Sequence, residues 1–228
     1  MTTSLPNGDM PLGPGPRTKV RRLPERARYD RETVNAILDE GFVCHLGVCE
    51  AGQPVVIPTT YARRGEVLYL HGAPASSVLA KAAAGGTVCL TVTLVDGLVL
   101  ARSAFHHSVN YRSVVLFGHA QEVTDPAEKC FALAALVEHI IPGRSQDARP
   151  PSETELRATR VLKVIVEEAS AKVRTGGPKD DPDDMQLTGV WAGELPLHSV
   201  AGPPLADPEG QGEAAVPPYV AAYRRGRG

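Results

Sequence analysis

Short runs of apolar and β-branched residues, separated by brief turn signals, follow one another through the middle of this chain. They predict strands at residues 42–48, 54–61, 67–71, 87–94, 98–101 and 113–123, with a closing strand at 158–169. Strands this short and this close leave little room for the helical crossovers that a parallel sheet requires. The pattern therefore predicts an antiparallel β-barrel and not a doubly wound parallel sheet.

Three helices are predicted around these strands. The first begins after Asp30, a favoured N-cap residue, and ends at Gly41, with apolar residues at helical spacing between them. A short second helix covers 76–84, and a longer one covers 126–141 with its proline near the first position. The predicted fold class is mainly β (α+β), with a few peripheral helices.

Proline and glycine are concentrated at the two ends of the chain. Of 228 residues, 20 are Pro and 22 are Gly, and much of this excess falls in residues 1–24 and 176–228. The first segment is predicted to be a flexible arm. The last is predicted to be a C-terminal extension that packs partly on the barrel through Trp191. Residues 25–175 remain as the barrel domain.

Charge and apolar patterning exclude several classes of function. Lys and Arg number 24 against 26 Asp and Glu, a net charge of −2, which argues against binding nucleic acid through bulk positive charge. No apolar stretch is long enough for a membrane-spanning helix, and the N-terminus lacks the apolar core of a secretory signal. The four cysteines form no C-x-x-C pair and are expected to be reduced thiols. We therefore expect a cytoplasmic protein with no nucleic-acid or membrane partner.

The densest group of polar residues is the segment 102–113. Its twelve residues include two Arg, three Ser, two His, an Asn and a Tyr, and no carboxylate. Because these groups donate hydrogen bonds to oxygen, the segment suits an anionic or carbonyl-rich ligand. The alternative is a polar surface turn. The candidate ligand contacts here are Ser103, His107, Asn110 and Arg112.

A second group of polar residues runs from His71 to Lys81. A strand ends, a turn of small residues follows, and a helix begins at Ser76 or Ser77. Free N–H groups, two hydroxyls and a lysine one turn on would suit a phosphate. The alternative is an ordinary serine N-cap beside a solvated lysine. On the strand before it, the hydroxyls of 59–61 either face a ligand or bond the backbone.

Several common sites are not predicted. His106 and His107 are adjacent, so on a strand they would point to opposite faces and could not both chelate one ion. No zinc-ligand spacing is present, so no metal site is expected. The glycine-rich dinucleotide and P-loop motifs and the G-x-S-x-G motif of serine hydrolases are also missing.

Taken in order, these motifs resemble the pyridoxamine 5′-phosphate oxidase-like, FMN-binding split-barrel superfamily, and within it the nitroimidazole-resistance-protein-like branch. The resemblance covers residues 20–195 approximately. It rests on Gly52-x-Pro54-x-x-x-Pro58, Leu68-Tyr69-x-His71-Gly72, the run 92–113, the run 172–176 and Trp191-Ala192-Gly193. The arginine-rich phosphate signature of the oxidases themselves is missing, so pyridoxamine phosphate oxidation is not expected.

The resemblance implies a six-stranded antiparallel split β-barrel that binds FMN at the two-fold interface of a homodimer. Ser76, Ser77 and Lys81 would hold the flavin phosphate, while the 58–61 strand and His71 would line the ring and ribityl chain. The implied cofactor-binding residues are Pro58, Thr59, Thr60, Tyr61, His71, Ser76, Ser77, Lys81, Ser103, His107, Asn110, Arg112 and Trp191.

The implied function is an FMN-dependent oxidoreductase that takes hydride from NADH or NADPH and reduces a small organic acceptor, such as a nitro compound. The flavin would carry the chemistry, and Arg112 or His107 would stabilise its anionic reduced form. No catalytic residue is assigned. Two alternatives stay open: a haem protein with His71, His106 or His107 as axial ligand, and a non-catalytic flavin-binding module. F420 in place of FMN also stays open.

Overall fold

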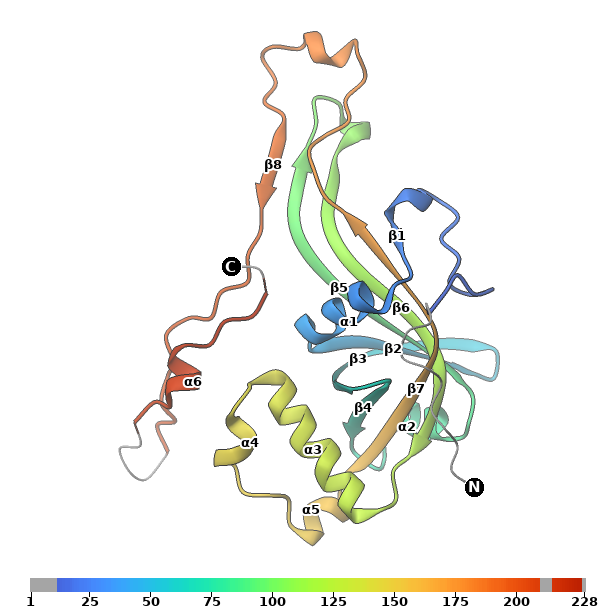
Figure 1. Cartoon of the computed structure of the whole chain (residues 1–228), viewed down its shortest axis with the longest axis vertical. Coiled ribbons are helices and arrows are strands. Elements are labelled where there is room, and N and C mark those ends of the chain that lie inside the picture. The colour runs from blue at the N-terminus through green and yellow to red at the C-terminus, as the bar shows by residue number, and fades with distance from the viewer. Residues whose placement is uncertain (1–11, 210–214, 227–228) are drawn as a thin grey trace.

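Six antiparallel strands close into a barrel in the computed structural model, which describes residues 12–209 and 215–226. The ring runs β7-β4-β3-β2-β5-β6 and closes because β6 also pairs with β7 (Figure 1). Its strands are β2 (Val43–Glu50), β3 (Gln53–Arg64), β4 (Val67–Gly72), β5 (Thr87–Leu100), β6 (Ser108–Glu122) and β7 (Arg160–Arg174). The predicted antiparallel barrel with few helices is confirmed.

Two short strands extend this sheet, so it has eight strands where six were predicted. β1 (Ala27–Arg28) pairs with β7, and β8 (Gly193–Pro196) pairs with β5. β1 and β8 lack the alternating apolar pattern that predicts a strand from sequence. Each is held mainly by backbone pairing to a longer neighbour.

Side chains alternate between the interior and the outer face along the barrel strands, as a period of two requires. Leu68 and Leu70 on β4, Leu90 on β5, Leu116 on β6 and Leu162 on β7 have no exposed surface and share one apolar core. The intervening residues face outward, where helices and the C-terminal extension can cover them.

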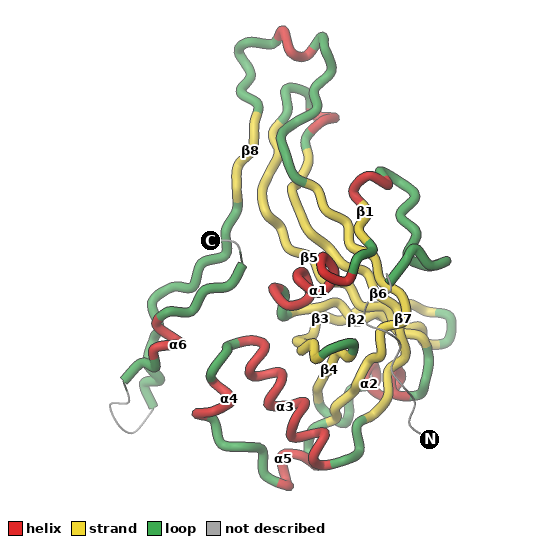
Figure 2. The backbone as a smooth tube through the Cα atoms, viewed as in Figure 1, coloured by secondary structure: helices red, strands yellow, loops and turns green. Residues whose placement is uncertain are grey.

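The β5–β6 hairpin is longer than the sequence indicated. Asp96-Gly97 reads as a turn between two strands, but the structure places a β-bulge there and β5 continues to Leu100. At Gly97 a side chain would approach the backbone of Leu195 within 3.0 Å, so the glycine lets β8 lie against the bulge. The hairpin projects beyond the barrel with β8 along its edge (Figures 1 and 2).

The three predicted helices are present. α1 (Arg31–Glu40) begins at Asp30, whose side chain accepts a 2.7 Å hydrogen bond from the amide of Thr33. α2 (Ser77–Ala83) and α3 (Pro126–Ile140) follow, and α3 packs on the outside of β3 and β4. Short helical segments not predicted are η1 (Pro24–Arg26), η2 (Ala104–His106), α4 (Arg144–Asp147), α5 (Glu153–Arg157), η3 (Asp184–Gln186) and α6 (Pro218–Ala221). Among the described residues, no helix is long and apolar enough to cross a membrane.

Both terminal segments lie against the barrel. Residues 12–24, predicted to be a flexible arm, are anchored by Leu12, which is buried and accepts a 3.0 Å hydrogen bond from the amide of Ala169 on β7. Residues 1–11 of the predicted arm lie outside the residues that the structure describes. In the C-terminal extension, Trp191 is 68% exposed. The extension is attached through β8 and through Arg225, described below, and not through Trp191.

Gly118 provides a test of the barrel closure, because it lies where β6 and β7 shift register. A Cβ at this position would overlap the carbonyl oxygen of Ile165. We expect Gly118→Ala to lower the free energy of unfolding by about 1–3 kcal/mol, the usual cost of overpacking. Urea denaturation measures this. Gly86→Ala is the matched control, since its added methyl meets no atom within 4 Å. Equal losses in the two variants would contradict the assignment.

Candidate functional site

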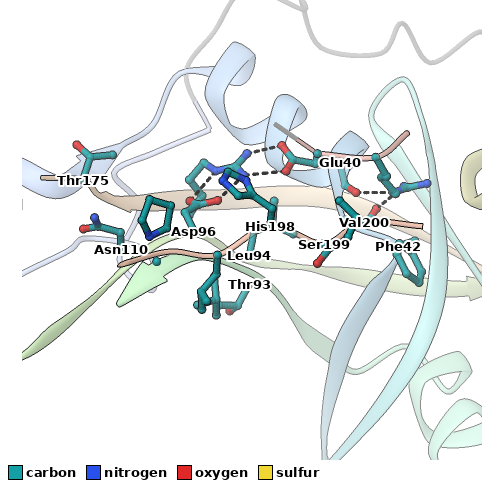
Figure 3. Close-up of a pocket in the computed structure, with 18 of the residues that line it drawn as sticks. Glu40, Phe42, Thr93, Leu94, Asp96, Asn110, Thr175, His198, Ser199 and Val200 are labelled. Carbon is teal, nitrogen blue, oxygen red and sulfur yellow. Dashed lines mark hydrogen bonds and ion pairs between the residues drawn. The ribbon is translucent and has the colours of Figure 1, made fainter. Parts of the chain in front are cut away.

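A cavity of about 700 Å³ lies between the outer face of the barrel and the C-terminal extension (Figure 3). Phe42 and Val43 at the start of β2 and residues 93–97 of β5 form its barrel side. Residues 196–201, from the end of β8 onward, form the facing wall together with Tyr223, Arg225 and Gly226. This volume is within the range of small-molecule and cofactor sites, and the mixture of apolar walls with a few polar groups is typical of them.

Arg112 lines the cavity and is held by two carboxylates, those of Glu40 and Asp96. Its Nε donates to Asp96 Oδ2 at 2.9 Å, and its Nη2 donates to Asp96 Oδ1 and to Glu40 Oε1, each at 2.7 Å. Hydrogen bonds to Asp96, and then to Glu40, raise the pKa of Arg112 above its ordinary value. The guanidinium is therefore charged, 6% exposed and fully committed to protein groups.

This network corrects the prediction of a concentrated anion site in the 102–113 segment. The segment itself has no carboxylate, but the fold supplies one or more to each of its arginines. Arg112 pairs with Glu40 and Asp96, and Arg102 Nη1 lies 2.8 Å from Asp180 Oδ2. Local composition missed these partners because they come from α1, the bulge in β5 and the C-terminal extension.

A second polar cluster lies at the end of the cavity where Asn110 and residues 175–176 meet β8. Asn110 Nδ2 donates to Glu194 Oε2 at 2.7 Å, and Arg174 donates to Asn110 Oδ1 and, at 2.9 Å, to the carbonyl of Gly176. Burial lowers the pKa of Arg174, which is only 6% exposed. These contacts fix the end of β7 to the hairpin and to β8.

Arg225 holds the C-terminal extension on the cavity. Its guanidinium donates to carbonyls at the ends of two helices, among them Glu40 at 2.6 Å in α1 and Ile140 at 3.0 Å in α3. It also lies over the Phe42 ring, 4.9 Å from the centroid. The last carbonyls of a helix have no partner within it, so a cation there satisfies them and complements the helix dipole. Arg225 thus positions Phe42 and Glu40 on the wall.

The structure brings only part of the predicted cofactor-binding set to this cavity, namely Asn110 and Arg112. Tyr61 lies in the core: it has no exposed surface, its hydroxyl donates to the Leu38 carbonyl at 2.6 Å, and burial raises its pKa. Pro58, Thr59 and Thr60 precede it on β3, with Thr59 Oγ1 3.4 Å from the Thr60 carbonyl.

The predicted phosphate group lies away from the cavity, around α2. Ser76 is the N-cap and its hydroxyl accepts from the Leu79 amide at 3.3 Å, while Ser77 is the first helical residue. Lys81 pairs at 3.3 Å with Glu50 and is half exposed. These contacts match the serine N-cap and solvated lysine that the sequence offered as the alternative.

The remaining predicted residues lie in two further places. Ser103 and His107 are at the hairpin tip, with His107 Nδ1 2.9 Å from the Ser103 carbonyl. His71 is the penultimate residue of β4 and lies on the outer face that Tyr69 shares. Its Nδ1 is buried and has no hydrogen-bond partner among the described residues, and burial lowers its pKa. The imidazole is therefore neutral at neutral pH.

Most of the residues that line the cavity had no predicted role, among them Glu40, Phe42, Asp96, His198 and Arg225. The only local signal among them is Asp96-Gly97, which was interpreted as a turn. The others stand at the end of a helix, the start of a strand or in the irregular extension, where no periodicity marks them.

The fold is therefore a small antiparallel barrel with a cofactor-sized cavity on its outer face. The model of the pyridoxamine 5′-phosphate oxidase family matches residues 30–173. The chain belongs to that family. No curated protein matches it.

Several solved structures are similar to this chain. The flavocytochrome Anf3 from Azotobacter vinelandii is 40% identical, with a TM-score of 0.86 and coverage of 93% of this chain and 99% of that one. The FAD and heme binding protein from Mycobacterium smegmatis is 34% identical, with a TM-score of 0.80 and coverage of 86% and 95%. A candidate 5-nitroimidazole antibiotic resistance protein from Bacteroides thetaiotaomicron is 25% identical, with a TM-score of 0.56 and coverage of 64% and 86%.

The Arg112 network leads to a stability prediction. Arg112→Met removes the charge and leaves Glu40 and Asp96, which are 21% and 29% exposed, without their partner. We expect the free energy of unfolding to fall by about 2–3 kcal/mol, less than for a fully buried pair because water still reaches the carboxylates. Urea denaturation with an unchanged m-value measures it. The control is Arg149→Met, which breaks an exposed ion pair with Glu155 and should leave the urea midpoint nearly unchanged. An equally small change in the Arg112 variant would contradict the stabilising role of Arg112.

Proposed function

We propose that this protein is a redox protein that binds a flavin and a haem and passes electrons from a nicotinamide donor through the flavin to the haem. The observation that carries the proposal is the 40% identity to a flavocytochrome across 93% of this chain. The relative that binds FAD and heme supports both cofactors independently. For that reason we propose FAD in place of the FMN that the family resemblance implied.

The cavity beside Arg112 fits the flavin. Phe42 and Val43 offer apolar surface, and Asn110, Thr175 and His198 offer polar groups (Figure 3). Because Arg112 is neutralised by two carboxylates, this cavity suits an uncharged ring better than a phosphate. When bound, the flavin would supply hydride acceptance and one-electron donation. The chain's part is to hold the ring against Phe42 and exclude water from it.

His71 fits the haem. A haem ligand must be a neutral imidazole, and burial holds the pKa of His71 below its ordinary value. Its buried Nδ1 has no partner among the described residues, which is the condition expected of a nitrogen that a bound group completes. By contrast, His107 is bonded to the Ser103 carbonyl and His106 faces two aspartates. Of the three histidines considered from sequence, His71 is the one we propose as axial ligand.

The test is the absorption spectrum of the purified protein, made in cells supplied with a haem precursor, before and after anaerobic addition of NADH or NADPH. We expect flavin bands and a Soret band, then flavin bleaching followed by reduction of the haem. His71→Ala should keep the flavin and lose the Soret band. His119→Ala, an exposed histidine paired with Glu167, is the control and should keep both. A Soret band that survives in the His71 variant would contradict the assignment of His71 as haem ligand. A bound flavin that neither NADH nor NADPH reduces would contradict the proposed electron transfer and indicate a non-catalytic flavin-binding module.

A homodimer is the assembly we propose. Val109 on β6, Leu98 on β5 and Leu195 on β8 form a cross-strand row of exposed apolar side chains along the hairpin, with Val95 on the same strand as Leu98. A contiguous apolar surface of this kind is typical of a self-association interface. A second copy seated there would also cover Val95, which lines the cavity and is 51% exposed.

Sedimentation equilibrium tests the dimer. The wild-type chain should sediment as a dimer at micromolar concentration, and Leu98→Asp should shift it to the monomer because it places a charge in an apolar interface. Leu205→Asp is the matched control: that leucine is 93% exposed and belongs to no strand. A wild-type monomer, or equal dissociation in both variants, would count against this interface.

A further inference from the structure

Three potential metal ligands meet at the far end of the hairpin, away from the cavity. His106 lies in η2 at the hairpin tip, and Asp181 and Asp184 lie in the loop between β7 and β8 (Figure 1). One ligand atom from each of the three lies within 4.8 Å of the other two. The two segments are about 75 residues apart in sequence, and the fold alone brings them together.

The imidazole of His106 lacks a hydrogen bond that would account for its position. Its Nε2 is buried and has no hydrogen-bond partner among the described residues. The nearest carboxylate oxygen, Asp181 Oδ2, is 3.1 Å away but outside hydrogen-bond geometry. Because a buried polar atom without a partner is costly, an imidazole nitrogen held in this way among carboxylates indicates a missing ligand.

The charges around His106 favour a cation. Residues 180–184 carry four aspartates, and the fold neutralises Asp180 with Arg102 through contacts of 2.8 and 2.9 Å. Within the described ranges, neither Asp181 nor Asp184 pairs with a lysine or an arginine. The two carboxylates that face His106 therefore repel each other, and a bound cation would remove that repulsion.

We propose that His106, Asp181 and Asp184 bind a divalent transition-metal ion of the zinc type. One imidazole nitrogen with two carboxylate oxygens matches zinc and its neighbours, whereas magnesium and calcium prefer oxygen ligands alone. Zinc bonds of about 2.0–2.2 Å place ligand atoms within roughly 4 Å of each other. The ligand atoms must therefore approach one another slightly, and the side chain of Asp181, which is 73% exposed, has room to make this movement.

The ion would act as a structural clamp, with water completing its coordination. It would tie the hairpin tip to η3 and so hold the loop that leads into β8. Arg102 lies beside the site but does not oppose the ion, since Asp180 neutralises it. This proposal does not depend on the proposed flavin or haem, because no ligand of the ion lines the cavity or lies on β4.

Equilibrium dialysis of the full-length, tag-free protein against zinc, after treatment with EDTA, tests the site. Elemental analysis should find one zinc per chain, counted separately from haem iron. His106→Asn and Asp184→Asn should each weaken zinc binding by at least about tenfold, because even the loss of a hydrogen-bond partner of a ligand costs about 10–100-fold. His107→Asn and Asp183→Asn are the matched controls: each alters the neighbouring residue of the same type and should bind zinc as the wild type does.

Two results would overturn the proposal. One is the absence of stoichiometric zinc from the wild-type protein. The other is an equal loss in Asp183→Asn and Asp184→Asn, which would indicate diffuse attraction to an acidic loop. Melting temperatures of all four variants without zinc establish that they fold, so weaker binding is attributable to the ligand. Because zinc and iron are measured as separate elements, a failed zinc site leaves the haem result intact.

Discussion

The pairing of β6 with β7 is the interaction on which the rest of this structure depends. These long strands run antiparallel from Tyr111 opposite Arg174 to Glu122 opposite Leu162, and their pairing turns a twisted sheet into a closed ring. Closure satisfies the backbone groups that edge strands would expose and creates one apolar interior. It also leaves β5 and β6 with ends that extend past the ring, and this overhang carries β8, one wall of the cavity and the hairpin tip.

Buried arginines define the chemistry of that overhang. Arg112 and Arg174 are each 6% exposed, and such cations are stable only where the fold supplies acceptors. Arg112 receives two carboxylates, while Arg174 receives an amide oxygen and two carbonyls. Because these acceptors come from α1, the bulge in β5, β6 and the C-terminal extension, the same contacts that satisfy the arginines also fix the cavity walls relative to one another.

The proposed sites divide along the molecule by the chemistry that each surface offers. The cavity combines an apolar wall with neutralised charge, which suits a flat conjugated ring. The outer face of β4 has a neutral, incompletely bonded imidazole, which suits a haem iron. The hairpin tip combines an imidazole with excess carboxylate, which suits a divalent cation. A redox protein with a structural ion at its hairpin tip would use all three without competition between ligands.

The sequence by itself determined the local elements and the family. Asp30 caps α1, Gly41 ends it, and the alternating apolar runs lie on the barrel strands because these features depend only on near neighbours. It also singled out Asn110 and Arg112, which the structure places in the lining of the cavity. Tertiary structure alone decided their partners, since Arg112 meets Glu40 across 72 residues and Arg225 meets it across 185. Tertiary structure also made Asp96-Gly97 a bulge and brought His106 close to Asp181 and Asp184. Strand register and chain reversal determine which distant side chains meet, and no local sequence pattern encodes them.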